Sequence, residues 1–178
     1  MQKLNKFKLP NDFRGRLGIV VQLWWMTDFF FFKLSPQIMY GWRRFLLRLF
    51  GARIGKGVII RPSVTVTYPW KVSIGDYSWI GDNVELYSLG EIEIGSNVVI
   101  SQKSYLCAAS HDYDKENFSI WSKKITIEDE CWLATDVYVA PGVTIGKGTV
   151  VGARSSVFND LPAGKVCIGS PAKPIKDR

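Results

Sequence analysis

The sequence predicts a mainly β protein in which a parallel β-helix follows an N-terminal helical arm. Three observations support this prediction. A six-residue period governs the chain from Ile54 onward, with its one long break over residues 112–124. The segment before it lacks this period and is rich in apolar and basic residues. The length of 178 residues suits one domain with an arm, so we expect an arm over residues 1–50 and a β-helix over residues 51–178.

Composition excludes several classes of protein. Hydrophobic residues make up 47% of the chain and charged residues 22%, which excludes a wholly disordered chain. Three cysteines in a chain of this length do not suggest a disulfide scaffold and fit a reducing compartment, so we expect a cytoplasmic protein. The single histidine excludes a site that needs two or three imidazoles from one subunit, and no metal is expected.

Charge is distributed unevenly along the chain. Residues 1–56 carry eleven Lys and Arg and only two acids, whereas residues 57–178 carry more acids than bases. Because the basic excess is confined to the first third, we expect no nucleic-acid-binding main domain. The excess suggests instead that the arm meets an anionic surface, such as lipid headgroups at the inner membrane face.

The arm contains the most apolar run of the sequence, over residues 17–32. Gln22 and Asp28 interrupt this run, and its length falls short of the roughly 20 residues that a membrane-spanning helix needs. A secretory signal is not expected, because the run starts late and no small-residue cleavage site follows it. Residues 36–50 are predicted to form an amphipathic basic helix with Ser35 as its cap. Docking of this helix on the protein itself or on a neighbouring subunit is favoured over peripheral membrane contact.

Each unit of the repeat opens on an aliphatic residue, as in the consecutive segments IGKGVI, IRPSVT and VTYPWK. Helices repeat apolar positions every 3.6 residues and flat strands every 2, so a period of six indicates short strands joined by tight turns. Three such strands would make one triangular coil of about 18 residues, with the aliphatic side chains stacked inside. About five coils are expected. Gly, Asn and Asp would occupy the turns, because they accept the left-handed conformations found there.

Two kinds of departure from the period carry information. Two-residue insertions at Val72–Ser73 and Ile92–Glu93 predict short bulges or corner extensions. Residues 112–124 are more than a turn needs, so this loop is a candidate functional element. His111, the only histidine, stands at the start of the loop.

The repeat resembles that of the hexapeptide-repeat acyltransferases, whose fold is a left-handed parallel β-helix and whose usual state is a homotrimer. The resemblance covers residues 35–178 and is greatest to the colanic acid biosynthesis acetyltransferase branch. It rests on the arm segment SPQIMYGWRRFLLRLFGARIG and on Arg61-Pro-Ser, Tyr68-Pro-Trp, Ser110-His-Asp-Tyr and Gly169-Ser-Pro-Ala-Lys. It implies transfer of an acetyl group from acetyl-CoA to a hydroxyl of a sugar in exopolysaccharide or surface polysaccharide biosynthesis.

Acetyl transfer to a sugar needs a base, because a hydroxyl is too weak an acid to attack a thioester unaided at neutral pH. His111 is the one residue of this type, and the matching histidine of the family is the general base for direct attack. Asp112 or a backbone carbonyl would hold its second ring nitrogen, and a backbone N–H would stabilise the oxyanion. A covalent route through Cys107, four residues upstream, is the alternative mechanism.

The resemblance also implies a coenzyme groove between two parallel solenoids. Phe158 falls where the family often has Thr, which removes a hydroxyl contact. Lysines near the C-terminus would contact the coenzyme phosphates as point charges, whereas Arg would donate two parallel hydrogen bonds. In order, the positions that match the family's coenzyme contacts are Trp132, Thr135, Ala153, Lys173 and Lys176.

Acceptor recognition is expected from the coils before the loop. Asp82, Glu85 and Tyr87 would lie near His111 if coils stack at intervals of about 18 residues. The acceptor would be a sugar or a lipid-linked sugar, and the basic arm would suit a lipid-linked one.

Other functions stay open on sequence grounds. The acceptor could be serine or an amino sugar, because acceptor identity lies in loops. A non-catalytic scaffold would keep the repeat but would not need a histidine beside the loop. A zinc carbonic anhydrase on this fold needs three histidines, which one histidine per chain cannot supply.

Overall fold

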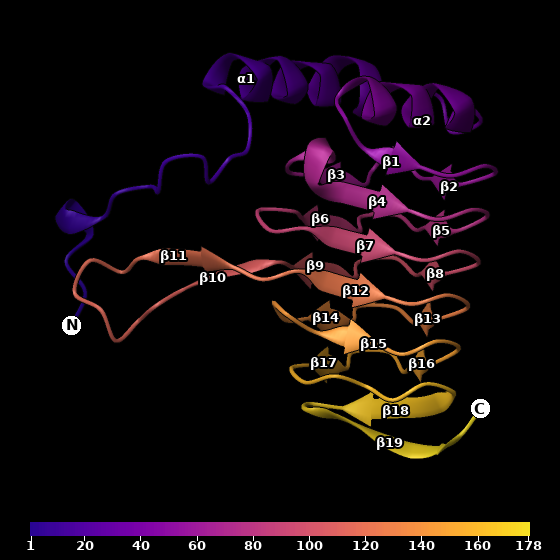
Figure 1. Cartoon of the computed structure of the whole chain (residues 1–178). Coiled ribbons are helices and arrows are strands. Elements are labelled where there is room, and N and C mark those ends of the chain that lie inside the picture. The colour runs from indigo at the N-terminus through magenta and orange to yellow at the C-terminus, as the bar shows by residue number, and fades with distance from the viewer.

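A computed structural model describes all 178 residues. It shows a triangular stack of short strands that is covered at one end by helices, with a two-stranded arm leaving one side (Figure 1). The predicted mainly β solenoid with an N-terminal helical region is therefore confirmed. The last helix ends at Leu49 and the first strand begins at Arg53, so the change of architecture falls beside the predicted boundary.

The helical elements precede the solenoid, apart from one short turn within it. None of them combines the length and the apolar character that crossing a bilayer would require. They are the 3-10 turn η1 (Leu4–Lys6), α1 (Gly18–Thr27), the π-helical η2 (Asp28–Lys33), α2 (Tyr40–Leu49) and the 3-10 turn η3 (Pro69–Lys71).

Three sheets form the faces of the prism, and in each sheet neighbouring strands come from successive coils. Sheet A contains β1 (Arg53–Ile54), β4 (Val72–Ile74), β7 (Ile92–Ile94), β12 (Ile125–Ile127) and β15 (Thr144–Ile145). Sheet B contains β2 (Ile59–Ile60), β5 (Trp79–Ile80), β8 (Val99–Ile100), β13 (Trp132–Leu133), β16 (Val150–Val151), β18 (Lys165–Gly169) and the antiparallel β19 (Ala172–Asp177). Sheet C contains β3 (Thr65–Val66), β6 (Glu85–Tyr87), β9 (Tyr105–Cys107), β14 (Tyr138–Val139) and β17 (Ser156–Val157).

The core is the column of aliphatic side chains that open the repeat units. Ile54 pairs with Ile74 and Ile74 with Ile94 in parallel register, and all three are buried. These upper coils are two residues longer than the regular coil. The extra residues lie at the corner between sheets C and A, where η3 also sits, which confirms the predicted corner extensions. Sheet B has one parallel strand more than the other sheets, so the stack exceeds the predicted five coils by a partial one.

The corner turns accept more residue types in the left-handed conformation than the sequence suggests. Asn83 and Asn97 adopt positive φ as expected, but so do Tyr77 (φ 59°), Lys103 (φ 63°) and Arg154 (φ 58°). A left-handed conformation costs a non-glycine residue about 1–2 kcal/mol. In each of these three turns, the residue's N–H donates to a carbonyl of the coil above, so the stacked coils enforce the conformation.

The helix α2 docks on the first coil, which has no coil above it to pair its outward carbonyls. Arg43 donates to the carbonyl of Ile60 (2.7 Å) and Arg44 to that of Val58 (2.8 Å). Arg48 donates to two carbonyls at the end of β1. The arginines thus replace the missing coil, since buried carbonyls need partners. The favoured interpretation of this segment, docking on its own domain, is confirmed.

Two details of this helix were predicted wrongly. The helix begins at Tyr40, four residues later than predicted, because residues 36–39 form a turn. Ser35 does not cap it: its hydroxyl donates to the carbonyl of Phe32 and accepts from Arg43. Gly51 (φ 94°) ends the helical region in a left-handed conformation, as its position suggests.

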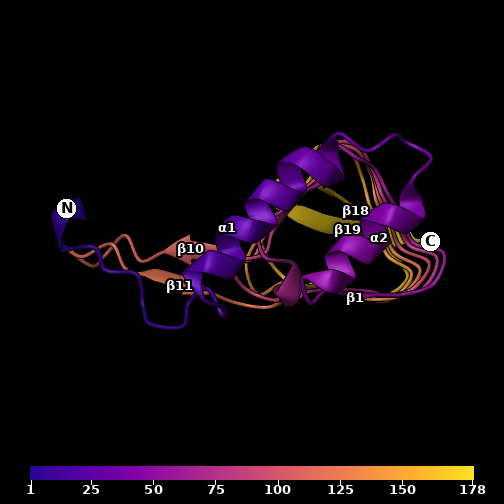
Figure 2. The same cartoon turned by 90° about the horizontal axis from the view of Figure 1, so that it is seen from above.

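The long insertion forms a β-arm at the corner between sheets C and A. Its strands β10 (Ala109–His111) and β11 (Ile120–Ser122) pair antiparallel, so His111 ends a strand and does not stand in a free loop. The N-terminal segment lies along the arm (Figures 1 and 2). The N–H of Lys3 donates to the carbonyl of Glu116, and the side chains of Lys3 and Lys6 pair with the carboxylate of Glu116.

Candidate active site

His111 is held in a defined orientation by the arm. Its Nδ1 lies 2.8 Å from the carbonyl oxygen of Phe118, and because a carbonyl only accepts, Nδ1 carries the proton. The ring stacks on that of Phe118 with centroids 4.3 Å apart and planes at 5°, while Phe7 of the N-terminal segment packs at 5.8 Å. Phe118 adopts φ 46°, a strained conformation that turns its carbonyl towards the imidazole. Nε2 therefore has no protein partner and is free to accept a proton.

Of the two partners expected for the ring, the backbone carbonyl is the one observed. Asp112 instead forms an ion pair with Lys115 at 3.0 Å. The hydrogen bond from Lys115 lowers the pKa of the Asp112 carboxyl. The neighbouring carboxylate thus stabilises the hairpin and does not set the tautomer of His111.

An aromatic column runs down the outward face of sheet C. The rings of Tyr87, Tyr105, Tyr138 and Phe158 follow one another with centroids 5.7–5.9 Å apart. Tyr87 is in register with Cys107 and packs against the small apolar cluster at the root of the arm. Burial raises the pKa of Tyr87, so its phenol stays protonated and can donate a hydrogen bond.

The other two acceptor candidates lie farther from the arm within the chain. Asp82 sits in the turn between sheets B and C, at the opposite edge of sheet C. Its carboxylate accepts from Arg61 Nε and from Ser63 Oγ, both at 2.8 Å. Glu85 opens β6, beside Tyr105. Within one chain, only Tyr87 is brought to the base of the arm.

Three of the coenzyme candidates lie at or next to the corner between sheets B and C. Trp132 faces outward from β13, and its Nε1 donates to Ser101 Oγ at 3.0 Å. The hydroxyl of Thr135 donates to the carbonyl of Gln102 at 3.1 Å. Ala153 is exposed in the turn of the next coil.

Ser101 and Gln102 were missed by the sequence reasoning. They are the second and third residues of the unit ISQKSY, which stacks directly above LATDVY, the unit of Thr135 that follows Trp132. The arm separates the two units in the sequence, which obscures their stacking.

The remaining coenzyme candidates, Lys173 and Lys176, lie on β19 at the far end of sheet B and are exposed. Sheet B runs in the order β13, β16, β18, β19, so both lysines lie below Trp132 on the same face. A hollow of about 330 Å³ continues the same surface upward, past Trp79 and Gln102. This side of the prism is the one that could hold an extended ligand.

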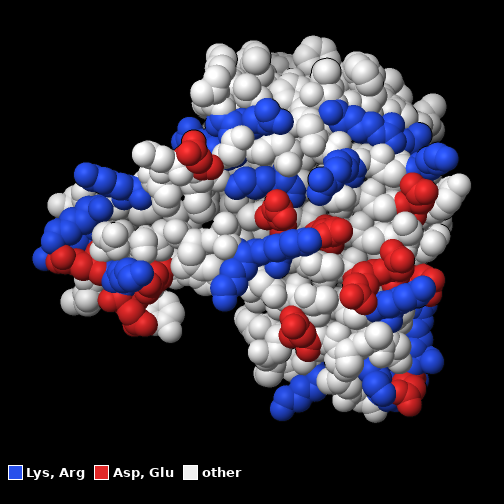
Figure 3. Space-filling model, in the orientation of Figure 1, with Lys and Arg blue, Asp and Glu red and all other residues white.

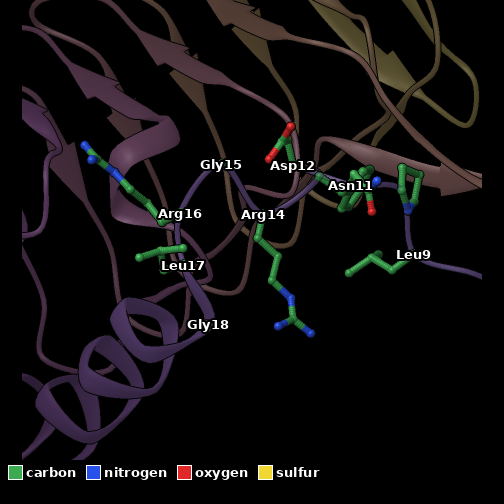
Figure 4. Close-up of a pocket in the computed structure, with 10 residues that line it drawn as sticks. Leu9, Asn11, Asp12, Arg14, Gly15, Arg16, Leu17 and Gly18 are labelled. Atoms are coloured by element: carbon green, nitrogen blue, oxygen red, sulfur yellow. The ribbon is translucent and has the colours of Figure 1, made fainter.

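The largest hollow, of about 670 Å³, is lined by residues 9–18 alone (Figure 4). A single consecutive segment lines it, so it brings together no groups from distant parts of the sequence. No group of three or more His, Cys, Asp or Glu side chains is placed to hold a metal ion.

The cysteines are poorly placed for a covalent mechanism. Burial raises the pKa of Cys131 to about 11 and also raises the pKa of Cys167, so both thiols stay protonated. Cys107 is half-buried, and its Sγ donates to the carbonyl of Ala109 at 3.1 Å. A nucleophile needs a nearby base, and the side chains beside Cys107 are the phenols of Tyr105 and Tyr138, whose pKa values burial raises.

Comparisons with known proteins agree with this geometry. Residues 124–159 match the family model described as bacterial transferase hexapeptide (six repeats). The chain is 62% identical over 178 residues to WcaF of Escherichia coli strain K12, which is named as a colanic acid biosynthesis acetyltransferase. The match covers 100% of this chain and 98% of that protein. Galactoside O-acetyltransferase of the same strain is 30% identical over 138 residues, covering 76% of this chain and 68% of that protein.

A solved structure has the same architecture. It is a hexapeptide-repeat acetyltransferase from Vibrio cholerae in complex with acetyl coenzyme A, with a TM-score of 0.81 and 26% identity. The match covers 89% of this chain and 87% of that one. The predicted left-handed parallel β-helix is thereby confirmed as the fold. The chain belongs to the hexapeptide-repeat acetyltransferases, in the branch that contains the colanic acid biosynthesis acetyltransferases.

Proposed function

We propose that this protein transfers an acetyl group from acetyl-CoA to a hydroxyl of a sugar in exopolysaccharide biosynthesis, with His111 as general base. The observation that carries the proposal is the hydrogen bond from His111 Nδ1 to the Phe118 carbonyl, which orients the ring and makes Nε2 the nitrogen that would act as base. The donor and the pathway are supported by the relative named for colanic acid biosynthesis and by the neighbour that binds acetyl coenzyme A.

The proposed reaction is a direct transfer in two proton steps. His111 Nε2 takes the proton of the acceptor hydroxyl as the hydroxyl oxygen forms a bond to the thioester carbon. When the tetrahedral intermediate collapses, the carbon–sulfur bond breaks. The imidazolium of His111 then returns the proton to the departing thiolate. The Phe118 carbonyl keeps the ring oriented throughout, because it accepts the Nδ1 proton in both states.

The complete site is proposed to need two subunits. His111 leaves the prism at the corner between sheets C and A, whereas Thr135 and Ala153 lie at the corner between sheets B and C. The full width of sheet C separates the two corners within one chain. In a homotrimer of parallel prisms, the arm of one subunit would reach the coenzyme corner of its neighbour.

The proposed coenzyme position follows sheet B and the adjoining corner. Trp132 and Thr135 would border the acetyl end, since their partners in the coil above fix both side chains. Ala153 would leave room for the pantetheine chain in the next coil. Lys173 and Lys176 at the end of sheet B would meet the phosphates.

The two-subunit arrangement also accounts for the acceptor candidates. Tyr87 would approach the sugar from the subunit that supplies His111, with its ring available for stacking. Asp82 of the neighbouring subunit would approach from the coenzyme corner, with its carboxylate oriented by Arg61 and Ser63. Glu85, on the face between the two corners, could hydrogen-bond a further hydroxyl.

Replacement of His111 tests this function directly. We expect His111→Ala to lower the rate of CoA release from acetyl-CoA in the presence of an acceptor by about 10²–10⁴-fold. Size-exclusion chromatography with light scattering should show an unchanged oligomer, because the ring is half-buried on an arm outside the prism. Asp112→Ala, on the same arm, is the matched control and should keep most of the activity. Full activity of His111→Ala would reject the proposed base.

A further inference from the structure

The outer surface of the N-terminal helices is apolar to a degree that packing on the solenoid does not explain. The inward side of the α1–η2 rod carries Val21, Trp24 and Phe32, which are buried. Met26 and Phe30 point the other way and remain 58% and 54% exposed. We call this outward apolar surface the dome. Its exposed members are Ile19, Leu23, Trp25, Met26, Phe29, Phe30, Phe31, Leu34, Ile38, Phe45 and Leu49.

The dome is one surface shared by both helices. The indole of Trp42 on α2 donates to the carbonyl of Phe31 on η2 at 2.9 Å, and it stacks on Phe45 of the same helix. The two helices lie side by side across the end of the prism, so their outer sides face away from the solenoid (Figures 1 and 2). Soluble monomers rarely expose apolar patches larger than a few hundred Å² unless the patch has a partner.

Basic charge predominates around the dome. Figure 3 shows the uncharged dome bordered below by a belt of Lys and Arg. Asp28 is the only acid between residues 13 and 52, and it is buried against Lys33. Exposed basic side chains precede α1 at Arg14 and Arg16, which extend in different directions from the linker (Figure 4).

We propose that the dome is a docking surface for an anionic lipid bilayer. The apolar and aromatic side chains would enter the boundary between headgroups and acyl chains, with the helices lying in the membrane plane. The basic belt would then stand at the level of the phosphates, where each Lys or Arg adds about 1 kcal/mol of attraction. The absence of exposed acids from the dome is what this location requires.

A second copy of the chain fits the dome less well than a bilayer does. Pairing two domes face to face would bring two basic belts together, and the like charges would repel. In the proposed trimer of parallel prisms, all three domes would lie at the same end. One flat bilayer could therefore contact three domes at once.

Docking in this orientation would set the distance of the site from the membrane. The arm follows β9, the third strand of sheet C below the N-terminal helices, so its root lies about 10 Å below the first coil. This part of the inference rests on the proposed function: the acceptor would be a sugar on a membrane-embedded lipid carrier.

Vesicle sedimentation tests the docking without relying on activity. The full chain should sediment with vesicles of phosphatidylcholine and phosphatidylglycerol, and more weakly with pure phosphatidylcholine. Met26→Ser/Phe30→Ser should weaken the binding by about tenfold or more. Its matched control is Ile168→Ser/Ile175→Ser, at the far end of the prism, where the residues are 46% and 56% exposed. The control should bind as the wild type does.

The same assay tests whether basic charge beside the dome contributes to vesicle binding. Arg14→Gln/Arg16→Gln should weaken binding to the anionic vesicles only, whereas Lys147→Gln/Arg154→Gln, with the same change of charge, should not. His111→Ala should bind like the wild type, so failure of the catalytic proposal would leave this result unchanged. Equal binding of the dome variant and the wild type would overturn the proposal. The proposal would also be overturned if the wild type formed an oligomer larger than a trimer, the dome variant lost this oligomer, and the wild type did not bind vesicles.

Discussion

The solenoid and its two outgrowths, the helical cap and the β-arm, hold their side chains in different ways. In the solenoid the same contact recurs from coil to coil, as when Ile74 packs between Ile54 and Ile94. In the cap and the arm each contact occurs once, such as the hydrogen bond from His111 to Phe118. The repeat therefore supplies a rigid frame, and the proposed base and the apolar surface of the helices lie where the repeat is interrupted or has not yet begun.

The largest effect on stability is expected from a contact that occurs once. Arg43 is fully buried and donates to the carbonyls of Ile60, Pro36 and Gln37 and to the hydroxyl of Ser35. Arg43→Met would leave these acceptors without partners, and we expect it to lower the free energy of unfolding by about 3 kcal/mol or more. Urea denaturation followed by tryptophan fluorescence would measure the loss.

Arg44 provides the comparison for this prediction. It is only half-buried and donates to a single carbonyl, so Arg44→Met should cost about 1 kcal/mol. Equal losses in the two variants would show that burial of the guanidinium does not decide its contribution.

The arm gives the next largest effect, on activity and not on stability. Phe118 is a positioning residue that stacks on His111 and supplies the carbonyl for Nδ1. Phe118→Leu keeps the carbonyl but removes the stacked ring, so we expect kcat to fall by up to about 100-fold. KM for acetyl-CoA should stay unchanged, because Phe118 is proposed to orient His111 and is not among the coenzyme candidates. A change confined to KM would contradict this role.

The buried carboxyl of the cap should reduce stability at neutral pH. Burial raises the pKa of Asp28 despite the ion pair with Lys33, and Oδ1 lacks a hydrogen-bond partner. Because the folded pKa is the higher one, the favourable contribution is present below the unfolded pKa and is lost as pH rises through the folded pKa. Asp28→Asn should stabilise the protein by roughly 1 kcal/mol at pH 7 and by nothing below pH 3. Thermal unfolding at both pH values would show a reversed sign if the ion pair outweighed burial.

The smallest effects concern the regular corners of the solenoid. Lys103→Gly relieves a positive φ of 63° and should raise the free energy of unfolding by up to about 1 kcal/mol. Gly148→Ala meets no atom within 4 Å but has φ 71°, so strain alone should lower stability by about the same amount. Chemical denaturation of both variants should give changes of opposite sign. Changes of the same sign would contradict this account of the corners.

The period was enough to predict the solenoid, including the inward aliphatic residues and the corner extensions. It failed at positions where stacking overrides local preference, such as the left-handed Tyr77 and Arg154. The cap was predicted in kind, but its boundaries were not. Ser35 bonds to the Phe32 carbonyl and to Arg43, and does not cap the helix. Arg43 is held there because the carbonyls of the first coil need hydrogen-bond donors. This long-range requirement cannot be recognised from the local sequence.

The candidate site could be predicted as a set of residues but not as an arrangement. His111 was identifiable because it is the only imidazole and stands beside the break in the repeat. The role of the Phe118 carbonyl depends on the hairpin register, which the irregular segment does not encode in any simple pattern. Ser101 and Gln102 were obscured because the arm separates stacked coils in the sequence. Only the coil register shows that Asp82 and His111 occupy opposite edges of sheet C.

A subunit-mixing experiment tests the central claim most directly. His111→Ala inactivates the arm, and Ala153→Arg fills the coenzyme corner, so each variant alone should be inactive. If every site combines the arm of one subunit with the corner of its neighbour, random trimers from an equal mixture should recover about a quarter of the wild-type rate. If the arm and the corner of the same chain form the site, every subunit in the mixture carries a defect. The mixture would then stay as inactive as the two parent variants, and the account would be contradicted.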